Sequence, residues 1–259
     1  MTDDWQETSF ASDISPDPVV LPGIQTFRGD DPVGVRMRNP GGGTAEVFLE
    51  EEESADSETG HKEEMLGFFT TDEGIIVDEN ASSIGETGVV TTRQSGASEW
   101  HTVRLDGTYS DPVVFAQLMS KNGGNPAHTR VRNVGSNSFE FQIEEWDYLN
   151  QAHTDEDIGY VVLESGLYPL PNGRLLEVGT TRTNHSWTSV SLNSQLGTGE
   201  DAVIVSRCQT HNGGNAVVTR HRNVSAGGFD VRLEEEEGSN GLHRTETIGY
   251  LAAVRDART

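Results

Sequence analysis

The chain has 259 residues and a net charge of −24 at pH 7, from 42 acidic and 18 basic side chains. This negative excess argues against a nucleic-acid partner, because phosphate binding needs clustered Lys and Arg. Cys208 is the single cysteine, so no intramolecular disulfide is expected. The sequence has no run of about 18 apolar residues that would span a membrane, and its acidic N-terminus lacks the apolar segment of a secretory signal.

The composition is typical of proteins from extreme halophiles. Only two of the basic residues are lysines, Lys62 and Lys121, and the hydrophobic content is 33%. At molar salt the Debye length is about 3 Å, so the self-repulsion of such a chain is screened. We therefore expect a haloarchaeal setting. An ordinary acidic protein from a low-salt organism is the alternative.

In chain order, short apolar segments alternate with polar turns. Two expected strands at residues 5–10 and 18–20 come first, followed by a turn at 27–31 and by Arg36-Met37-Arg38-Asn39. The later segments follow the same order: strands at 100–105, 112–114, 129–134, 139–144 and 158–163, then at 187–192, 202–205, 219–224, 229–234 and 248–254. The chain therefore contains one module three times.

The repeat is clearest between the second and third copies. Residues 129–134 recur at 219–224, ninety positions later, and Asn122-Gly123-Gly124-Asn125 recurs as Asn212-Gly213-Gly214-Asn215. Self-similarity at a fixed period indicates a repeat architecture, in which each copy is one structural module. We place repeat 1, a degenerate copy, at residues 1–70, repeat 2 at 71–166 and repeat 3 at 167–259.

The expected strands predict the fold class. Residues 139–144 and 229–234 alternate strictly between apolar and polar side chains, which indicates half-buried strands of an antiparallel sheet. No segment has a sustained apolar period of 3.6 residues. We predict an all-β protein made of three tandem small antiparallel β-sandwich modules.

Repeats 2 and 3 carry a leading strand that repeat 1 lacks. This strand is expected near residues 88–93 and 177–182, whereas only four residues precede Trp5. The sheet of repeat 1 would then have an open edge, which proteins usually cover. We expect the linker at residues 72–85 or another subunit to cover it.

Each module resembles the H-type lectin domain. The pattern is Pro112-Val113-Val114, Arg132-Asn133-Val134, Phe139-Glu140-Phe141 and Gly159-Tyr160, with counterparts in repeat 3. The resemblance implies six-stranded sandwiches that trimerise and bind sugars in loops near the subunit junctions. H-type lectins often carry a tryptophan after the alternating strand; Trp146 stands there in repeat 2, but Glu52 and Glu236 stand there in the other repeats.

A His-x-x-Glu motif occurs once in each repeat, at His61, His153 and His243. Residues three apart on a strand point to opposite faces, so we favour a structural hydrogen-bond network at the strand entry. A metal or sugar site is the alternative, because both side chains are common ligands.

Two acidic runs and one aromatic segment are further candidates. The runs at residues 50–52 and 234–237 could hold Ca²⁺ or Mg²⁺, although a solvated face is the favoured interpretation. Trp146-Asp147-Tyr148 suits the faces and hydroxyls of a sugar, and it is equally suited to anchoring a loop or packing in an interface. No nucleophile–base arrangement, phosphate loop or cysteine cluster is present, so we expect neither an enzyme nor a metal or cofactor.

These observations combine into a functional hypothesis. We expect a virion surface or appendage protein of a haloarchaeal virus, such as a turret, spike or tail fibre component, assembled in the host cytoplasm. A cellular carbohydrate-binding protein is the alternative. The expected partners are a cyclic homo-oligomer, other virion proteins and host glycans; an intramolecular pseudo-trimer remains open as the other arrangement. The candidate glycan-binding residues are Asn122, Asn125, Trp146, Asp147, Tyr148, His153, His211, Asn212, Asn215 and His243.

Overall fold

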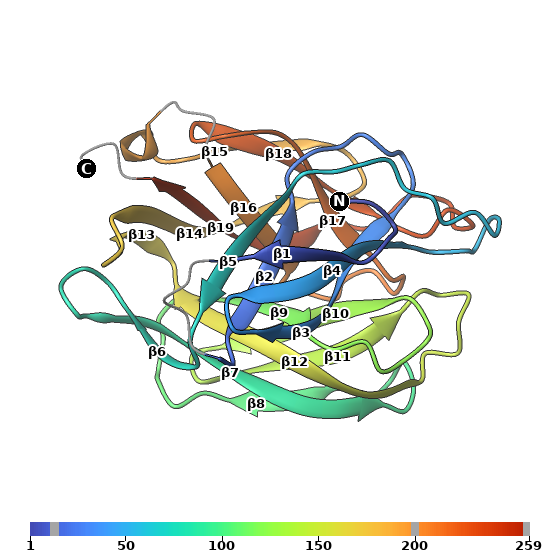
Figure 1. Cartoon of the computed structure of the whole chain (residues 1–259), viewed down its shortest axis with the longest axis horizontal. Helices are drawn as coiled ribbons and strands as arrows, with labels where there is room; N and C mark the ends of the chain where they lie inside the picture. Colours follow the sequence, from blue (N-terminus) through green and yellow to red (C-terminus); the bar gives the residue numbers. More distant parts are fainter. Residues whose placement is uncertain (11–15, 198–201, 256–259) are drawn as a thin grey trace.

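The structure is a computed structural model that describes residues 1–10, 16–197 and 202–255. These residues form an all-β protein, as predicted (Figure 1). The one helical element among them is the short 3-10 turn η1 (Ser194–Leu196). No helix in the described part of the chain has the length and apolar character needed to cross a membrane.

Repeat 2 is a sandwich of two antiparallel sheets. The strand orders are β6-β7-β12-β9 and β10-β11-β8. Apolar side chains that alternate along the strands, among them Phe139, Phe141 and Ile143, are buried between the sheets. The strands are β6 (Gly74–Val77), β7 (Ser83–Gln94), β8 (His101–Arg104), β9 (Pro112–Leu118), β10 (Ala127–Gly135), β11 (Ser138–Glu145) and β12 (His153–Glu164).

Repeat 3 has the same topology. Its sheets have the orders β13-β14-β19-β16 and β15-β18-β17. Phe229, Val231 and Tyr250 occupy the core positions of their counterparts in repeat 2. The strands are β13 (Gly166–Pro169), β14 (Arg174–Thr183), β15 (Thr188–Ser191), β16 (Ala202–Cys208), β17 (Val218–Ser225), β18 (Gly228–Glu234) and β19 (Glu246–Arg255).

Repeat 1 is smaller, because one of its sheets has two strands. That sheet pairs β2 (Val19–Ile24) with β5 (Leu66–Thr71), and the other sheet orders β1 (Gln6–Ser9), β4 (Thr44–Glu51) and β3 (Val33–Gly41). The leading strand is absent from the described residues, as the sequence predicted. The linker strand β6 pairs with β7 of repeat 2 and so does not complete this sheet, contrary to one of our expectations.

The shared Arg-Asn motif produces the same bend in all three modules. Asn39, Asn133 and Asn223 have φ of 52°, 49° and 54°, a left-handed conformation that asparagine tolerates better than most residues. Each lies where the register of the β3–β4, β10–β11 or β17–β18 pair shifts. Each asparagine amide also donates a hydrogen bond to a carboxylate on the paired strand, in Glu46, Glu140 or Asp230.

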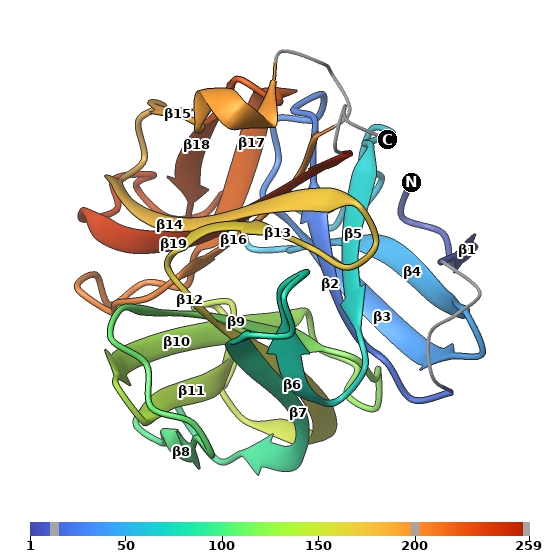
Figure 2. The same ribbon diagram turned by 90° about the vertical axis from the view of Figure 1, so that its left-hand side faces the viewer.

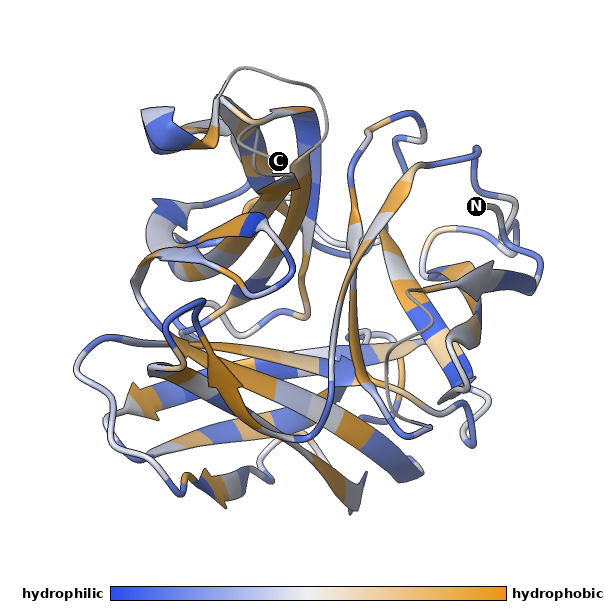
Figure 3. Cartoon of the chain, turned by 60° about the vertical axis from the view of Figure 1, so that its left-hand side comes forward, coloured by the Kyte–Doolittle hydropathy of each residue, from blue (hydrophilic) through white to orange (hydrophobic). Residues whose placement is uncertain are grey.

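The three modules surround a common centre (Figure 2). Strands β2, β9 and β16, one from each module, are neighbours there. Glycines permit this close approach: a Cβ at Gly67, Gly159 or Gly249 would lie within about 3 Å of a valine side chain of the next module. Figure 3 shows hydrophobic residues alternating with hydrophilic ones along the strands, and apolar side chains from all three modules form one continuous core cluster. A single chain thus supplies the trimer-like arrangement that the lectin resemblance implied for three subunits.

Candidate functional site: the three module junctions

One buried arginine per module links it to the next. Arg36, Arg130 and Arg220 are at most 1% exposed and occupy equivalent positions on β3, β10 and β17. Each guanidinium contacts a glutamate of its own module and a glutamate of a neighbouring module. The nitrogen–oxygen distances are 3.3 and 3.1 Å from Arg36 to Glu50 and Glu156, 3.4 and 2.9 Å from Arg130 to Glu144 and Glu246, and 2.9 and 3.0 Å from Arg220 to Glu234 and Glu64.

The order of these contacts is cyclic. Module 1 reaches module 2 through Arg36, module 2 reaches module 3 through Arg130, and module 3 returns to module 1 through Arg220. Removing a charged partner from water is costly unless it is paired and hydrogen-bonded. The three arginines therefore fix which surfaces of the modules meet.

The glutamates that receive the neighbouring arginine are held as carboxylates. Glu156 accepts the backbone N–H groups of Asn122 and Gly123, the hydroxyl of Ser120 and a contact from His153. Burial would raise the pKa of Glu156, but these hydrogen bonds outweigh it and lower the pKa to about 2. The equivalent glutamates, Glu64 and Glu246, have the same environment and a pKa of about 2.

In all three modules the His-x-x-Glu motif places a histidine between two carboxylates. His153 Nδ1 lies 2.8 Å from Glu145 and its Nε2 lies 3.0 Å from Glu156. His243 makes the same contacts at 2.9 and 3.2 Å with Glu235 and Glu246, and His61 lies between Glu51 and Glu64. The motif thus forms the hydrogen-bond network that we favoured.

The expectation that His153 and Glu156 point to opposite faces is wrong. The register of β12 against β7 shifts between these two residues. An irregularity of this kind inserts extra backbone and re-aims the side chains, so both side chains turn to the same side. No residue pattern near His153 indicates this shift.

The Asn-Gly-Gly-Asn loops hold the predicted residues around these histidines. Asn122 and Asn125, together with His153, line a cleft of about 320 Å³ in module 2. The Asn122 amide donates to the Asp155 carbonyl at 2.8 Å, and the Asn125 amide donates to Glu145 at 3.0 Å. In module 3 the loop has the same form, with Asn212 bonded to Thr245, Asn215 to Ser239, and His243 buried below the loop.

Trp146, Asp147 and Tyr148 lie at the junction of modules. The Trp146 ring is 1% exposed and packs with His128, Ala216 and Val218. Asp147 accepts the backbone N–H of Ala216 at 3.2 Å. Tyr148 is 38% exposed, and its hydroxyl accepts the backbone N–H of Glu53 at 3.1 Å. The sequence left sugar binding, loop anchoring and interface packing open for this segment. These contacts match packing in an interface, here between modules of one chain.

His211 also lies at a junction, and it leads to a feature that our sequence analysis missed. The His211 ring packs edge-on against Trp100 of module 2, with 5.2 Å between the ring centroids. Burial, and to a lesser extent the nearby charge of Arg130, lowers the pKa of His211. Each module has one tryptophan stacked under an arginine: Arg38 over Trp5 at 4.1 Å, Arg132 over Trp100 at 3.9 Å and Arg222 over Trp187 at 4.3 Å. The recurrence of Trp and of Arg-Asn in every repeat could have revealed the pairing.

Two polar clefts open at the junctions. A cleft of about 560 Å³ between modules 1 and 2 is lined by Arg38, Asn39, Lys121, Asn122 and Asp157, among others. A second cleft, of about 350 Å³, lies between modules 1 and 3, with Asp30, His185 and Arg232 in its lining. Amide, guanidinium and carboxylate groups of this kind can hydrogen-bond to hydroxyl groups of a ligand.

Apart from Glu237, which is exposed, the acidic runs are not solvated faces, contrary to our favoured interpretation. Glu50, Glu51 and Glu52 are at most 8% exposed, and the same holds for residues 234–236. They are buried because cations or N–H groups reach them: Lys121 and Arg36 contact Glu50, and His61 contacts Glu51. The runs belong to the junctions.

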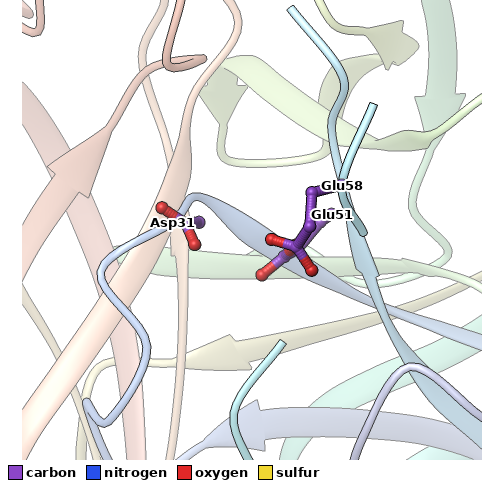
Figure 4. A group of neighbouring side chains, drawn as sticks. All are labelled: Asp31, Glu51 and Glu58. Carbon is purple, nitrogen blue, oxygen red and sulfur yellow. The ribbon is translucent and has the colours of Figure 1, made fainter. Parts of the chain in front are cut away.

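Asp31, Glu51 and Glu58 form a group of carboxylates that could hold a divalent cation (Figure 4). Their oxygens all lie within 4.8 Å of one another. Asp31 occupies the position of Asn125 in module 2, where an amide donates to the carboxylate instead. The protonated carboxyl of Glu237 donates a hydrogen bond to the Asp31 carboxylate, and this bond, with some desolvation, raises the pKa of Glu237 to about 7. Negative charge is therefore crowded in this corner of the junction.

A small cavity of about 60 Å³ lies at the common centre. Arg207 lines it and donates to the Pro22 carbonyl, the Ala116 carbonyl and the Gln117 side chain. Burial lowers the pKa of this guanidinium to about 10. The cavity has room for a few water molecules and not for a sugar. Cys208 lies beside it in the core, as expected, and burial raises the pKa of its thiol to about 12.

The chain is similar to halomucin from Haloquadratum walsbyi. The two are 35% identical over 176 residues, which is 63% of this chain and 2% of halomucin. The chain thus spans a very small part of that protein's length. No protein-family model and no solved structure matches the chain. The similarity gives the chain a haloarchaeal relative, in agreement with its acidic composition.

Proposed function

We propose that the chain is a non-enzymatic surface or appendage protein of a haloarchaeal virus, a turret, spike or tail fibre component that presents three lectin-like modules as one rigid unit. Its role would be assembly with other virion proteins and attachment to host surface glycans. The cyclic Arg–Glu interlock carries this proposal. It joins the three modules in one chain and leaves polar clefts where neighbouring modules meet.

The junction clefts are the binding sites in this proposal. The cleft between modules 1 and 2 offers side chains of both charges and amides within one hollow, with Asn122 among the predicted residues. Tyr148 keeps a partly exposed ring, which suits the apolar face of a sugar. The Trp146 ring is buried, so in this arrangement it supports the junction and does not contact the ligand.

The histidine networks support a non-enzymatic role. Both ring nitrogens of His153 and of His243 are within hydrogen-bond distance of carboxylates. A general base must reach the proton that it abstracts, and these buried rings are engaged on both sides. We therefore assign them to holding the loops.

A cellular carbohydrate-binding protein of a haloarchaeon is the second candidate. The similarity to halomucin favours it, because that relative belongs to a haloarchaeon. Both candidates share glycan binding at the junctions. They differ in location: antibody labelling of purified virus particles supports the first, and labelling confined to virus-free cells supports the second.

Glycan binding is tested on a panel of haloarchaeal surface glycans in about 2 M KCl, where charge repulsion is screened. We expect saturable binding to at least one glycan and a tenfold or greater loss in Asn122→Ala. Asn80→Ala is the matched control, since Asn80 is exposed in the turn between β6 and β7. Absence of binding to any glycan, or equal loss in both variants, would contradict the proposed site.

A further inference from the structure

One edge of the β2–β5 sheet has no strand beside it. β5 pairs with β2 from Val19↔Thr71 to Ile24↔Leu66, and within residues 1–10, 16–197 and 202–255 no strand pairs with its other side. In the other two modules that position is filled, by β7 against β12 and by β14 against β19. The internal repeat therefore shows what a complete edge looks like in this fold.

A groove of about 700 Å³ follows the unpaired edge. Phe68 and Phe69 of β5 lie on one side of it, and Ile75 and Ile76 of β6 lie on another. Ile75 is 58% exposed, which is unusual for so large an apolar side chain here. Exposed backbone donors and acceptors beside apolar side chains form a template for strand addition.

The first residue pair that the missing strand would form is already present, between Met1 and Glu64. The Met1 amine donates to the Glu64 carbonyl at 2.8 Å, and the Glu64 N–H donates to the Met1 carbonyl at 3.0 Å. The equivalent glutamates pair with Thr92 of β7 and with Thr183 of β14. The unpaired edge of β5 is thus continuous with an interface that the chain has begun to form.

The other modules also specify the chemistry of the strand that fits. Tyr160 faces Gly88 of β7, and Tyr250 faces Gly179 of β14. A Cβ at Gly88 would lie 3.0 Å from Cζ of the Tyr160 ring, and a Cβ at Gly179 would lie 2.9 Å from Cζ of the Tyr250 ring. Only glycine therefore leaves room for the ring, and this holds for a phenylalanine ring as well. Phe68 occupies the equivalent position on β5, and its ring packs against Phe10 at 5.4 Å. A strand that docks there needs a glycine opposite Phe68.

We propose that the open edge of β5 is a docking site for an extended strand of a partner polypeptide, which binds antiparallel to β5 and places a glycine over Phe68. The strand resembles β7, with threonines and valines following the glycine as in Gly88-Val89-Val90-Thr91. A second copy of this chain is not the occupant, because β7 and β14 of each copy are already paired on their own sheets. Of the residues that line this groove, Glu73 alone also lines the cleft between modules 1 and 2.

The test uses the intact chain and a labelled peptide of residues 84–91, which ends before the position that Met1 already fills opposite Glu64. The buffer contains about 2 M KCl so that charge repulsion is screened. Fluorescence anisotropy should show saturable binding with a micromolar Kd. The same peptide carrying Gly88→Val should bind at least tenfold more weakly, because the added side chain meets Phe68. Hydrogen exchange should show new protection of the backbone amides of residues 66–71 when the wild-type peptide is bound.

Three results would overturn the proposal. One is the absence of peptide binding at millimolar concentration. Another is equal binding of the wild-type, Gly88→Val and scrambled peptides, which would indicate nonspecific adsorption. The third is a chain that dimerises without peptide and loses the dimer when peptide is added, which would assign the edge to a second copy. Glycan binding is unaffected by any of these outcomes.

Discussion

Arg220 of the last module lies 3.0 Å from the carboxylate of Glu64 in the first module. Both side chains are buried. This contact closes a ring that the Arg36–Glu156 and Arg130–Glu246 pairs begin. A buried ion pair is weak evidence for stability, because desolvation offsets much of its attraction. Its clear consequence here is that the modules can meet in one alignment, since an arginine placed against another surface would be buried without a partner.

Arg130→Met should strongly destabilise the chain. The substitution removes the cation that Glu144 and Glu246 share and leaves two buried carboxylates without it. Breaking a buried pair in this way costs about 3–5 kcal/mol. We expect a loss of that size in the free energy of unfolding, measured by urea titration at high salt.

Arg132→Met is the matched control for that experiment. Arg132 lies two residues away on the same strand, and its side chain is 33% exposed beside Glu140. Pairs of this kind contribute about 0–1 kcal/mol, with a similar amount from the stacking on Trp100. Equal losses in the two variants would show that the buried interlock has no special role.

Acid should unfold the chain below pH 4.5. The pKa values of Glu64, Glu156 and Glu246 are about 2 in the folded chain, compared with 4.5 as the ordinary value. Groups with a lowered pKa stabilise the fold above the unfolded value, and this stabilisation is lost as the pH falls towards 2. Melting temperatures recorded from pH 7 to pH 2 at constant salt should therefore fall most steeply in that window. A flat profile across it would contradict the assigned hydrogen bonds.

Asp31→Asn should stabilise the chain at neutral pH. The substitution restores the amide that Asn125 offers to Glu145 in module 2 and removes a charge beside Glu51 and Glu58. One recovered hydrogen bond contributes about 1 kcal/mol. We expect a higher melting temperature at pH 7 than for the unsubstituted chain, by differential scanning calorimetry.

The pH dependence of the stabilisation by Asp31→Asn tests whether charge crowding around Asp31 causes it. The pKa of Glu237 is raised to about 7 beside Asp31, so its contribution to stability is full below 4.5 and is lost as the pH rises through 7. The advantage of the variant should therefore grow between those two values. An advantage that is constant with pH, or a lower melting temperature of the variant when no divalent cation is added, would exclude this explanation.

Much of the fold could be predicted from the sequence, because repeats and strand alternation are local patterns. The alternation at residues 139–144 indicated β11. The loop asparagines and the His-x-x-Glu motif could also be placed near one another. Their positions follow from chain order within one module.

The junctions could not be predicted in the same way, because they join residues from different modules. Nothing near Arg220 in sequence indicates Glu64, which lies 156 positions earlier. The burial of Glu50, Glu51 and Glu52 follows from partners on other strands, and so an acidic run appeared to be a solvated face. The single-chain ring also makes junctions that we had expected between subunits; association of whole chains remains a prediction.

The molecular mass in solution tests the closed ring most directly. Light scattering in about 2 M KCl, where charge repulsion is screened, should give a particle of one chain at the lowest concentrations, with a mass of 28.2 kDa. That particle should keep its cooperative unfolding, and Arg220→Met should lower its melting temperature without changing its mass. A particle of three chains that persists on dilution and dissociates in Arg220→Met would mean that the modules pair between chains, and it would contradict closure of the ring by Arg220 and Glu64 within one chain.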